Sequence, residues 1–248
     1  METQTNFKLL YEKNIVVLSG ILFCAGISSV IAQTNTIADW TFESVSILAQ
    51  TNTPADGNVL PIAADVGSGS LTGHHATAVG SEFSTPSGNG SSKALSANNW
   101  LANDYWQAQV STLTYANLIV VWDQTASATG PKNWALQYST DGTAFTSFFT
   151  YTVPAATAWN PSTAATTTSY NVDLTSVLSL DNLSAAYFRL VDTSAATGGA
   201  VNGGNVGTSG TGRIDNFAVL SVPEPTSLAL AALGGFAVLG LSIFKKRN

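Results

Sequence analysis

The fold is decided by the stretch WALQYSTDGTAFTSFFTYTV, residues 134–153. Two runs rich in aromatic residues and threonine, 134–139 and 145–153, flank the turn sequence Ser139-Thr140-Asp141-Gly142-Thr143. Asp-Gly readily adopts the positive φ values that tight hairpin turns require. The stretch therefore predicts a β-hairpin, and similar strand patterns occur on both sides of it.

Near the N-terminal end Ala38, Trp40 and Phe42 alternate with polar residues, which predicts a half-buried strand. Turn signals such as Gly130-Pro131 and Asn160-Pro161 separate the later runs. Those runs are 105–111, 118–123, 169–174, 187–191 and 213–220, with one short helical turn at 176–180. The predicted fold class is all-β, a single two-sheet antiparallel sandwich of jelly-roll type over residues 33–221.

Residues 33–221 contain four basic and twelve acidic residues, a net charge of −8. This balance, without a basic patch, argues against a nucleic-acid partner. Six tryptophans and the aliphatic runs supply the burial that a disordered chain lacks. The one cysteine, Cys24, falls in the N-terminal apolar segment, so the mature domain is expected to have no disulfide and no thiol chemistry.

Residues 1–32 have the three parts of a secretory signal peptide. Lys8 and Lys13 form the basic part, Ile15–Ile31 the apolar part, and Val30-Ile31-Ala32 the small-residue exit before Gln33. An uncleaved N-terminal membrane helix is the alternative, and the small residues favour cleavage.

Residues 222–248 combine a proline-rich turn, an apolar run and a basic end. Ser227–Phe244 has 18 residues without a charge, which as a helix would span about 27 Å against a hydrocarbon core of about 30 Å. The basic end Lys245-Lys246-Arg247 prefers the cytoplasmic side. The order predicts a C-terminal transmembrane helix with the domain across the membrane.

This tail resembles the PEP-CTERM sorting signal of Gram-negative, exopolysaccharide-producing bacteria. The resemblance rests on Val222, Pro223, Glu224 and Pro225, on the apolar run and on the basic end. It implies recognition and processing by an exosortase, with export through the inner membrane to the envelope, surface or extracellular matrix. The membrane would hold the chain through the C-terminal helix before processing. An ordinary C-terminal membrane anchor is the alternative.

Three segments, 40–43, 122–142 and 212–219, are similar to secreted bacterial β-sandwich domains and, through them, to galactose-binding-like jelly rolls. The resemblance implies that the first and last strands lie close together. It covers the fold and says little about activity, because this architecture serves many functions.

In similar jelly rolls a first-strand acidic residue and the last-strand Asp help to hold a structural calcium ion. The resemblance therefore implies Glu43 and Asp215 as calcium ligands, with Asp39 as a weaker third. The alternative is that Asp215 pairs with Arg213 or caps a turn and that Glu43 is solvated. No other cofactor is predicted.

The sequence favours a protein that is not an enzyme. His74 and His75 are adjacent, so in a strand they would face opposite sides and could not share a metal. No Gly-x-Ser-x-Gly motif is present, and the carboxylates of a glycosidase pair cannot be told from solvated ones. The Gly-rich stretch 198–212 lacks phosphate-loop and calcium-repeat patterns, which predicts a long flexible loop.

Sugar binding uses exposed aromatic rings, and Trp100 and Trp159 stand in loop-like contexts. Trp40, Trp106 and Trp134 are instead expected in the core. The predicted function is a non-catalytic structural or adhesive component of an exopolysaccharide or biofilm matrix, with polysaccharide or matrix partners. The alternative is a carbohydrate-binding module, and a more distant one is a secreted glycoside-active enzyme.

Overall fold

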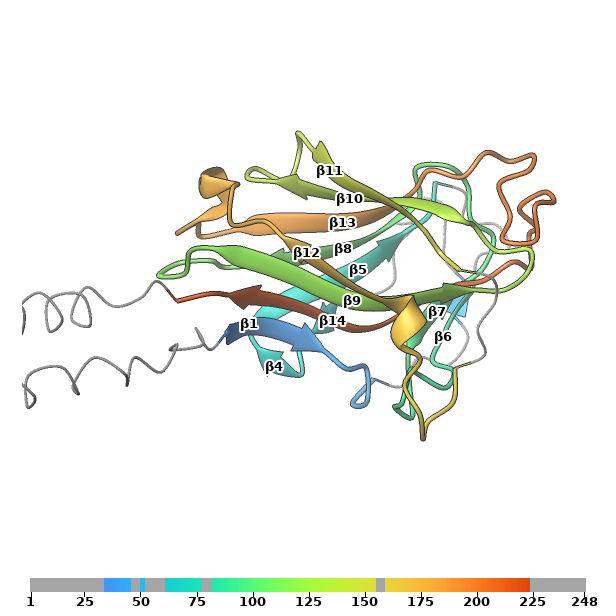
Figure 1. Ribbon diagram of the computed structural model, residues 1–248, viewed down its shortest axis with the longest axis horizontal. Coiled ribbons are helices and arrows are strands. Elements are labelled where there is room, and N and C mark those ends of the chain that lie inside the picture. The colour runs from blue at the N-terminus through green and yellow to red at the C-terminus, as the bar shows by residue number, and fades with distance from the viewer. Residues whose placement is uncertain (1–33, 46–49, 52–60, 77–81, 155–158, 224–248) are drawn as a thin grey trace, which may run out of the picture. The chain divides into compact units, whose positions relative to one another are not determined.

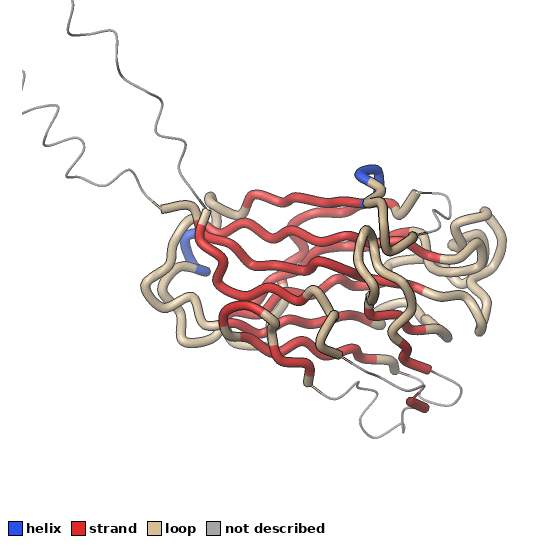
Figure 2. The backbone as a smooth tube through the Cα atoms, turned by 90° about the horizontal axis from the view of Figure 1, so that it is seen from below, coloured by secondary structure: helices blue, strands red, loops and turns tan. Residues whose placement is uncertain are grey.

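The computed structural model describes residues 34–45, 50–51, 61–76, 82–154 and 159–223. These residues form two antiparallel sheets that face each other (Figure 1). Loops gather at the two ends of the strands (Figure 2). The predicted fold class, an all-β two-sheet sandwich, is confirmed.

The chain divides into residues 1–32 and residues 33–248, and every described residue belongs to the second unit. The predicted signal peptide and the tail from Glu224 onward lie outside the described residues. Within the described ranges no helix is long and apolar enough to cross a membrane. The helical elements found there are two single 3-10 turns, η1 (Thr166–Thr168) and η2 (Leu178–Leu180), the second at the predicted place.

Six strands form sheet B, in the order β11-β10-β13-β8-β5-β3. They are β3 (Ile62–Ala63), β5 (Gly69–His74), β8 (Tyr105–Val110), β10 (Asn133–Ser139), β11 (Thr146–Thr152) and β13 (Ala186–Asp192). The predicted hairpin is β10–β11. Gly142 has φ 76° in its turn, and Asp141 Oδ1 accepts hydrogen bonds from the backbone N–H groups of Thr143 and Ala144.

Eight strands form sheet A, whose main path is β12-β9-β14-β7-β6-β2, with β1 paired to β14 and β4. They are β1 (Asn35–Trp40), β2 (Gln50–Thr51), β4 (Val66–Gly67), β6 (Glu82–Ser84), β7 (Leu95–Ala97), β9 (Leu118–Ala126), β12 (Ser169–Asp173) and β14 (Gly212–Ser221). Asn35 lies opposite Ser221, so the first and last strands are neighbours, as the resemblance implied.

The core lies between the sheets and is rich in tryptophan. Trp40, Trp106 and Trp134 are buried, which confirms their expected positions. Trp100 joins the latter two, with ring centroids 5.1 Å from Trp106 and 4.9 Å from Trp134 in edge-to-face geometry. Such pairs stabilise beyond the area that they bury, by about 0.5–1.5 kcal/mol each.

The Gly-rich segment forms the predicted loop between β13 and β14, and it is attached to a neighbouring turn. Its backbone is hydrogen-bonded to the turn before β10: Val201 N to Gly130 O at 3.1 Å and Asn202 N to Ala128 O at 2.9 Å. A Cβ on Gly130 would lie 2.2 Å from Thr211 O, so the two segments approach too closely for any other residue there.

Gly73→Ala tests the packing between the sheets. A Cβ at Gly73 in β5 would lie 2.5 Å from Phe83 Cε1 and 2.6 Å from Trp106 Cζ3. We expect the free energy of unfolding to fall by about 1–3 kcal/mol, because the rings must move apart. Urea unfolding followed by tryptophan fluorescence measures the change. The control is Gly204→Ala, where a Cβ meets only the Asn202 side chain, at 3.1 Å or more; equal losses in both variants would contradict the assignment.

Candidate functional site

Trp100 and Trp159 are buried, with 2% and 6% of their surface exposed. Trp100 Nε1 donates to Ala97 O at 2.9 Å inside the core. Trp159 Nε1 donates to Thr168 Oγ1 at 3.1 Å, and its ring centroid lies 5.9 Å from the guanidinium carbon of Arg213. Their predicted exposure is wrong, so neither indole offers a ring face on which a sugar could stack.

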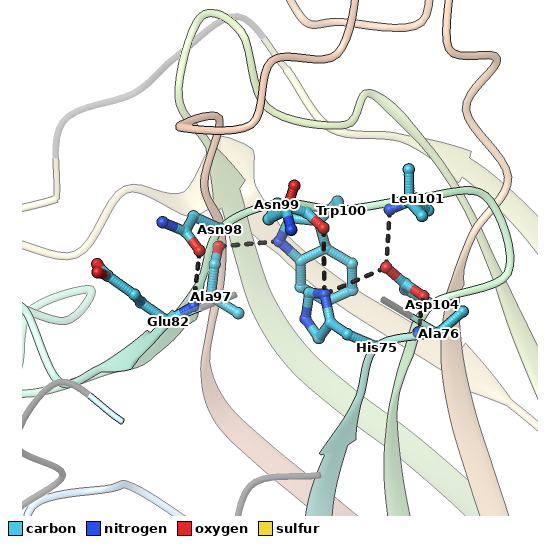
Figure 3. Close-up of polar contacts among 9 residues, drawn as sticks. All are labelled: His75, Ala76, Glu82, Ala97, Asn98, Asn99, Trp100, Leu101 and Asp104. Carbon is cyan, nitrogen blue, oxygen red and sulfur yellow. Dashed lines mark hydrogen bonds and ion pairs between the residues drawn. The ribbon is translucent and has the colours of Figure 1, made fainter. Parts of the chain in front are cut away.

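His75 follows β5 and forms a buried pair with Asp104 (Figure 3). His75 Nδ1 lies 3.1 Å from Asp104 Oδ2, and both side chains are fully buried. The carboxylate also accepts hydrogen bonds at 2.7 Å from the backbone N–H groups of Ala76 and Leu101. Asp104 therefore holds the end of β5 against the turn before β8.

The surroundings of His75 are aromatic. Its ring lies 4.4 Å from Trp100 and 5.3 Å from Phe83, between centroids. Nε2 is buried and has no hydrogen-bond partner among the described residues, so no hydroxyl there completes a Ser-His-Asp triad. His74 lies on the other side of the strand, stacked 4.7 Å from Tyr105, as adjacent strand positions require.

Asp192, at the end of β13, is a second buried carboxyl group beside this pair. Its backbone N–H donates to Asp104 O at 2.8 Å, and Oδ1 accepts from Ser194 N at 2.7 Å. Oδ2 has no partner among the described residues. Burial raises the pKa of Asp192 to about 6, because the ionised form has lost most of its hydration.

The two residues implied as calcium ligands are joined through one loop, residues 86–94. Asp215 Oδ2 accepts from Asn89 N at 2.7 Å and from Ser91 Oγ at 2.6 Å. Glu43 Oε1 accepts from Lys93 N at 2.8 Å. The loop therefore lies over the outer face of sheet A, and burial raises the pKa of Asp215 to about 6.

These contacts do not fit a calcium ion. Calcium takes six to eight oxygen ligands, whereas the carboxylate oxygens named above already accept protein hydrogen bonds. The ammonium of Lys93 donates to Glu43 O at 3.0 Å and Val45 O at 2.8 Å, so a cation already occupies these carbonyls. Asp39 lies in β1 near Asp65 instead. Among the described residues no three His, Cys, Asp or Glu side chains form a metal cluster.

A second segment covers sheet A on the same side. Ala165 N donates to Asn89 Oδ1 at 2.6 Å, and Gly90 N donates to Asn160 O at 3.0 Å. Residues 159–168 are thereby attached to the 86–94 loop. Asp123, which lies opposite Asp215 in the sheet, is also buried. This part of the outer face of sheet A is consequently closed to large ligands.

Sheet B carries an open polar row on its outer face. The row consists of Thr72 (β5), Gln107 (β8), Arg189 (β13), Gln137 (β10) and Ser147 (β11), each opposite the next. All five are at least partly exposed, whereas the core-facing residues on either side of Gln107 and Arg189 are buried. The sequence does not reveal this site, because it does not show which strands are neighbours in the sheet.

Arg189 is the centre of the row and of a stack of flat groups. Its guanidinium carbon lies 3.9 Å from the ring centroid of Tyr105 and 3.5 Å from that of Phe145. Both rings therefore pack against the guanidinium. His74 covers the other face of Tyr105. Nε donates to Gln107 Oε1 at 2.7 Å, and partial burial lowers the pKa of Arg189.

The row has the chemistry to bind polyhydroxylated molecules. Amide, hydroxyl and guanidinium groups supply both donors and acceptors on a flat surface. Apart from the Arg189–Gln107 bond, the side chains of the row make no hydrogen bond to another residue in the described part of the chain. Their remaining donors and acceptors face solvent and are available to a ligand.

Asp192→Asn tests the buried carboxyl group. Folding raises the pKa of Asp192 from 3.8 to about 6. The folded state is therefore most stable below about pH 4, where the carboxyl group is protonated, and it loses stability as the pH rises through 6. The variant cannot ionise, so its stability relative to the wild type should rise between pH 4 and 7, by on the order of 3 kcal/mol. Denaturant unfolding across this range measures it.

Asp173→Asn is the matched control, because hydrogen bonds from Thr175 lower the pKa of this exposed carboxylate. Because this carboxylate is ionised in both the folded and the unfolded state above about pH 4, the stability of the variant relative to the wild type should stay nearly constant between about pH 4 and 7 and rise only as the pH falls further. The same pH trend in both variants would refute the role of burial at Asp192.

Comparison with known proteins gives weak structural likenesses and one motif. No curated protein matches the chain. The K1 cleaved adhesin domain of Lys-gingipain from Porphyromonas gingivalis W83 is 14% identical, with 75% of this chain and 97% of that chain covered and a TM-score of 0.37. The module TmCBM61, solved with β-1,4-galactotriose, is 13% identical, with 62% and 88% covered and a TM-score of 0.32.

A mannan-recognising carbohydrate-binding module, TmCBM27, is 11% identical, with 77% of this chain and 96% of that chain covered and a TM-score of 0.34. None of these likenesses is strong enough to bear on the ligand or activity of this chain. The family model of the PEP-CTERM protein-sorting motif matches residues 221–247. That range contains the Val222–Pro225 motif and the basic Lys245-Lys246-Arg247. The chain thus carries a PEP-CTERM sorting motif that begins at the last residue of its β-sandwich, Ser221.

Proposed function

We propose that this protein is a non-catalytic adhesive component of the cell surface or extracellular matrix. In this role it binds polysaccharide through the outer face of sheet B, centred on the polar row. The proposal unites the structural role and the carbohydrate-binding alternative in one molecule.

Export supports the proposal. The PEP-CTERM motif marks the chain as an exported protein, and the resemblance of the tail to exosortase substrates supports an origin in an exopolysaccharide-producing bacterium. A domain delivered there meets polysaccharide at high local concentration. Even weak individual contacts then suffice if many copies bind the same polymer.

The observation that carries the proposal is the in-register polar row from Thr72 to Ser147. A polysaccharide is itself an extended, repeating ligand, and a row of donors and acceptors across five strands matches that form. When exposed polar side chains exchange hydrogen bonds with water for hydrogen bonds with sugar hydroxyls, the net change in free energy is small. Such a surface therefore favours specificity over high affinity.

A non-catalytic role is supported by the burial of the groups that could do acid–base chemistry. His75 and Asp104 are enclosed by aromatic rings. Asp215 lies beneath the 86–94 loop, and Asp123, opposite it in the sheet, is also buried. A catalytic pair must reach its substrate directly or through one water.

Binding is tested with the purified full-length protein and a panel of immobilised neutral and acidic polysaccharides. We expect retention on at least one polymer, and about a tenfold loss for Gln137→Ala, whose amide lies in the row and makes no hydrogen bond to another side chain or backbone group in the described part of the chain. The control is Asn171→Ala, an exposed amide in β12 of sheet A. Retention on no polymer, or equal losses in both variants, would refute the proposed site.

Processing of the tail gives a separate prediction. If an exosortase acts on the motif at 221–247, the mature surface protein should lack the residues that follow the Pro-Glu-Pro sequence. Mass spectrometry of the protein released from producing cells identifies its last residue. A surface form that still ends at Asn248 contradicts processing.

A further inference from the structure

The charges of the two sheets differ sharply. The strands of sheet B contain one acidic residue, Asp192, which is buried. The strands of sheet A contain five: Asp39, Glu82, Asp123, Asp173 and Asp215. Arg189 is the basic residue of the sheet B strands, so the outer face of sheet B carries a positive charge within an acidic domain.

Arg189 has no carboxylate partner in the described part of the chain. The ion pair found among those residues joins His75 and Asp104. Two other cations are engaged within the domain. Lys93 binds two carbonyl oxygens, and Arg213 donates to Ser87 O at 3.1 Å and lies near Asp215. With Nε given to Gln107, both terminal nitrogens of Arg189 remain to donate hydrogen bonds outward.

The two rings restrict the orientation of this fork. Separations of 3.5 and 3.9 Å are van der Waals contacts, so Tyr105 and Phe145 together restrict the movement of the guanidinium. A guanidinium held in this way loses little further conformational freedom when it binds a ligand, which favours bidentate contacts. A planar carboxylate in the same plane accepts two parallel hydrogen bonds from it. A tetrahedral sulfate would direct other oxygens toward the flanking rings.

We infer that the polysaccharide bound by sheet B is an acidic one, whose uronate carboxylate is held by Arg189. The neighbouring amides of Gln107 and Gln137 then face the hydroxyl groups of the same chain. This inference rests on the proposed function, because it names the ligand class of that site. The interaction is charge-assisted and partly exposed, so binding weakens as salt is added.

The test compares two ligands that differ only in their carboxylates: polygalacturonate and the same polymer after its carboxylates have been reduced to alcohols. Full-length protein should bind the first more tightly, with the difference shrinking at high salt. Arg189→Gln should weaken binding of polygalacturonate about 10- to 100-fold and leave the reduced polymer little affected. Lys132→Gln, the same change of charge outside the row, should alter neither.

Arg189→Lys separates charge from geometry. It keeps the charge and loses the fork, so most of the affinity gained from the carboxylate should be lost. Urea unfolding of each variant shows whether its sandwich is intact. Equal binding of both polymers by the wild type, or full binding by Arg189→Gln, would overturn the uronate assignment. The glycan-binding function would survive that result if Gln137→Ala still loses retention. Tighter binding of dextran sulfate than of polygalacturonate would overturn the assignment of a carboxylate ligand. Binding of no polymer would overturn both the uronate assignment and the glycan-binding function.

Discussion

Strand β14 is the element on which the sandwich depends, because three other strands hydrogen-bond to it. It pairs with β9 over most of its length, with β7 at its start and with β1 at its end. Its inward side chains Ile214, Phe217 and Val219 are all buried in the core. Sheet A therefore cannot close until the last part of the domain has been added, and such long-range pairing is slow to form because it closes long loops.

The outer face of sheet A is partly covered by loops, whereas the outer face of sheet B is open to solvent. On sheet A the 86–94 loop provides hydrogen-bond partners for the buried carboxylate of Asp215, and residues 159–168 are hydrogen-bonded to that loop. On sheet B the polar row is left to solvent. Covering one face explains how an acidic chain buries several carboxyl groups, while the strands of the uncovered sheet B carry no exposed carboxylate. The buried acids destabilise the fold at neutral pH, as raised pKa values imply.

Much of the fold could be predicted because the signals were local. Asp141-Gly142 specified its turn chemically, and the alternation at Trp40 specified which residues face inward. The strands between residues 50 and 97 were missed. Five of them have only two or three residues, too few to show a period, and the six residues of β5, GSLTGH, contain one large apolar side chain. Trp100 and Trp159 were misjudged because a loop position does not determine whether a ring points outward. The row around Arg189 depends on five strands being neighbours in one register, which no single segment encodes.

The connection between the domain and its sorting motif has a mechanical consequence. The motif begins at Ser221, inside β14, and the next backbone N–H, that of Val222, donates to Asn117 O at 3.0 Å. No spacer separates the tail from the central strand of sheet A. Tension applied through the tail would run along β14 and load its hydrogen bonds to β9 and β1 in shear, all together and not one after another. A domain held in this way resists extraction by force far better than one suspended from an edge strand that could be peeled away.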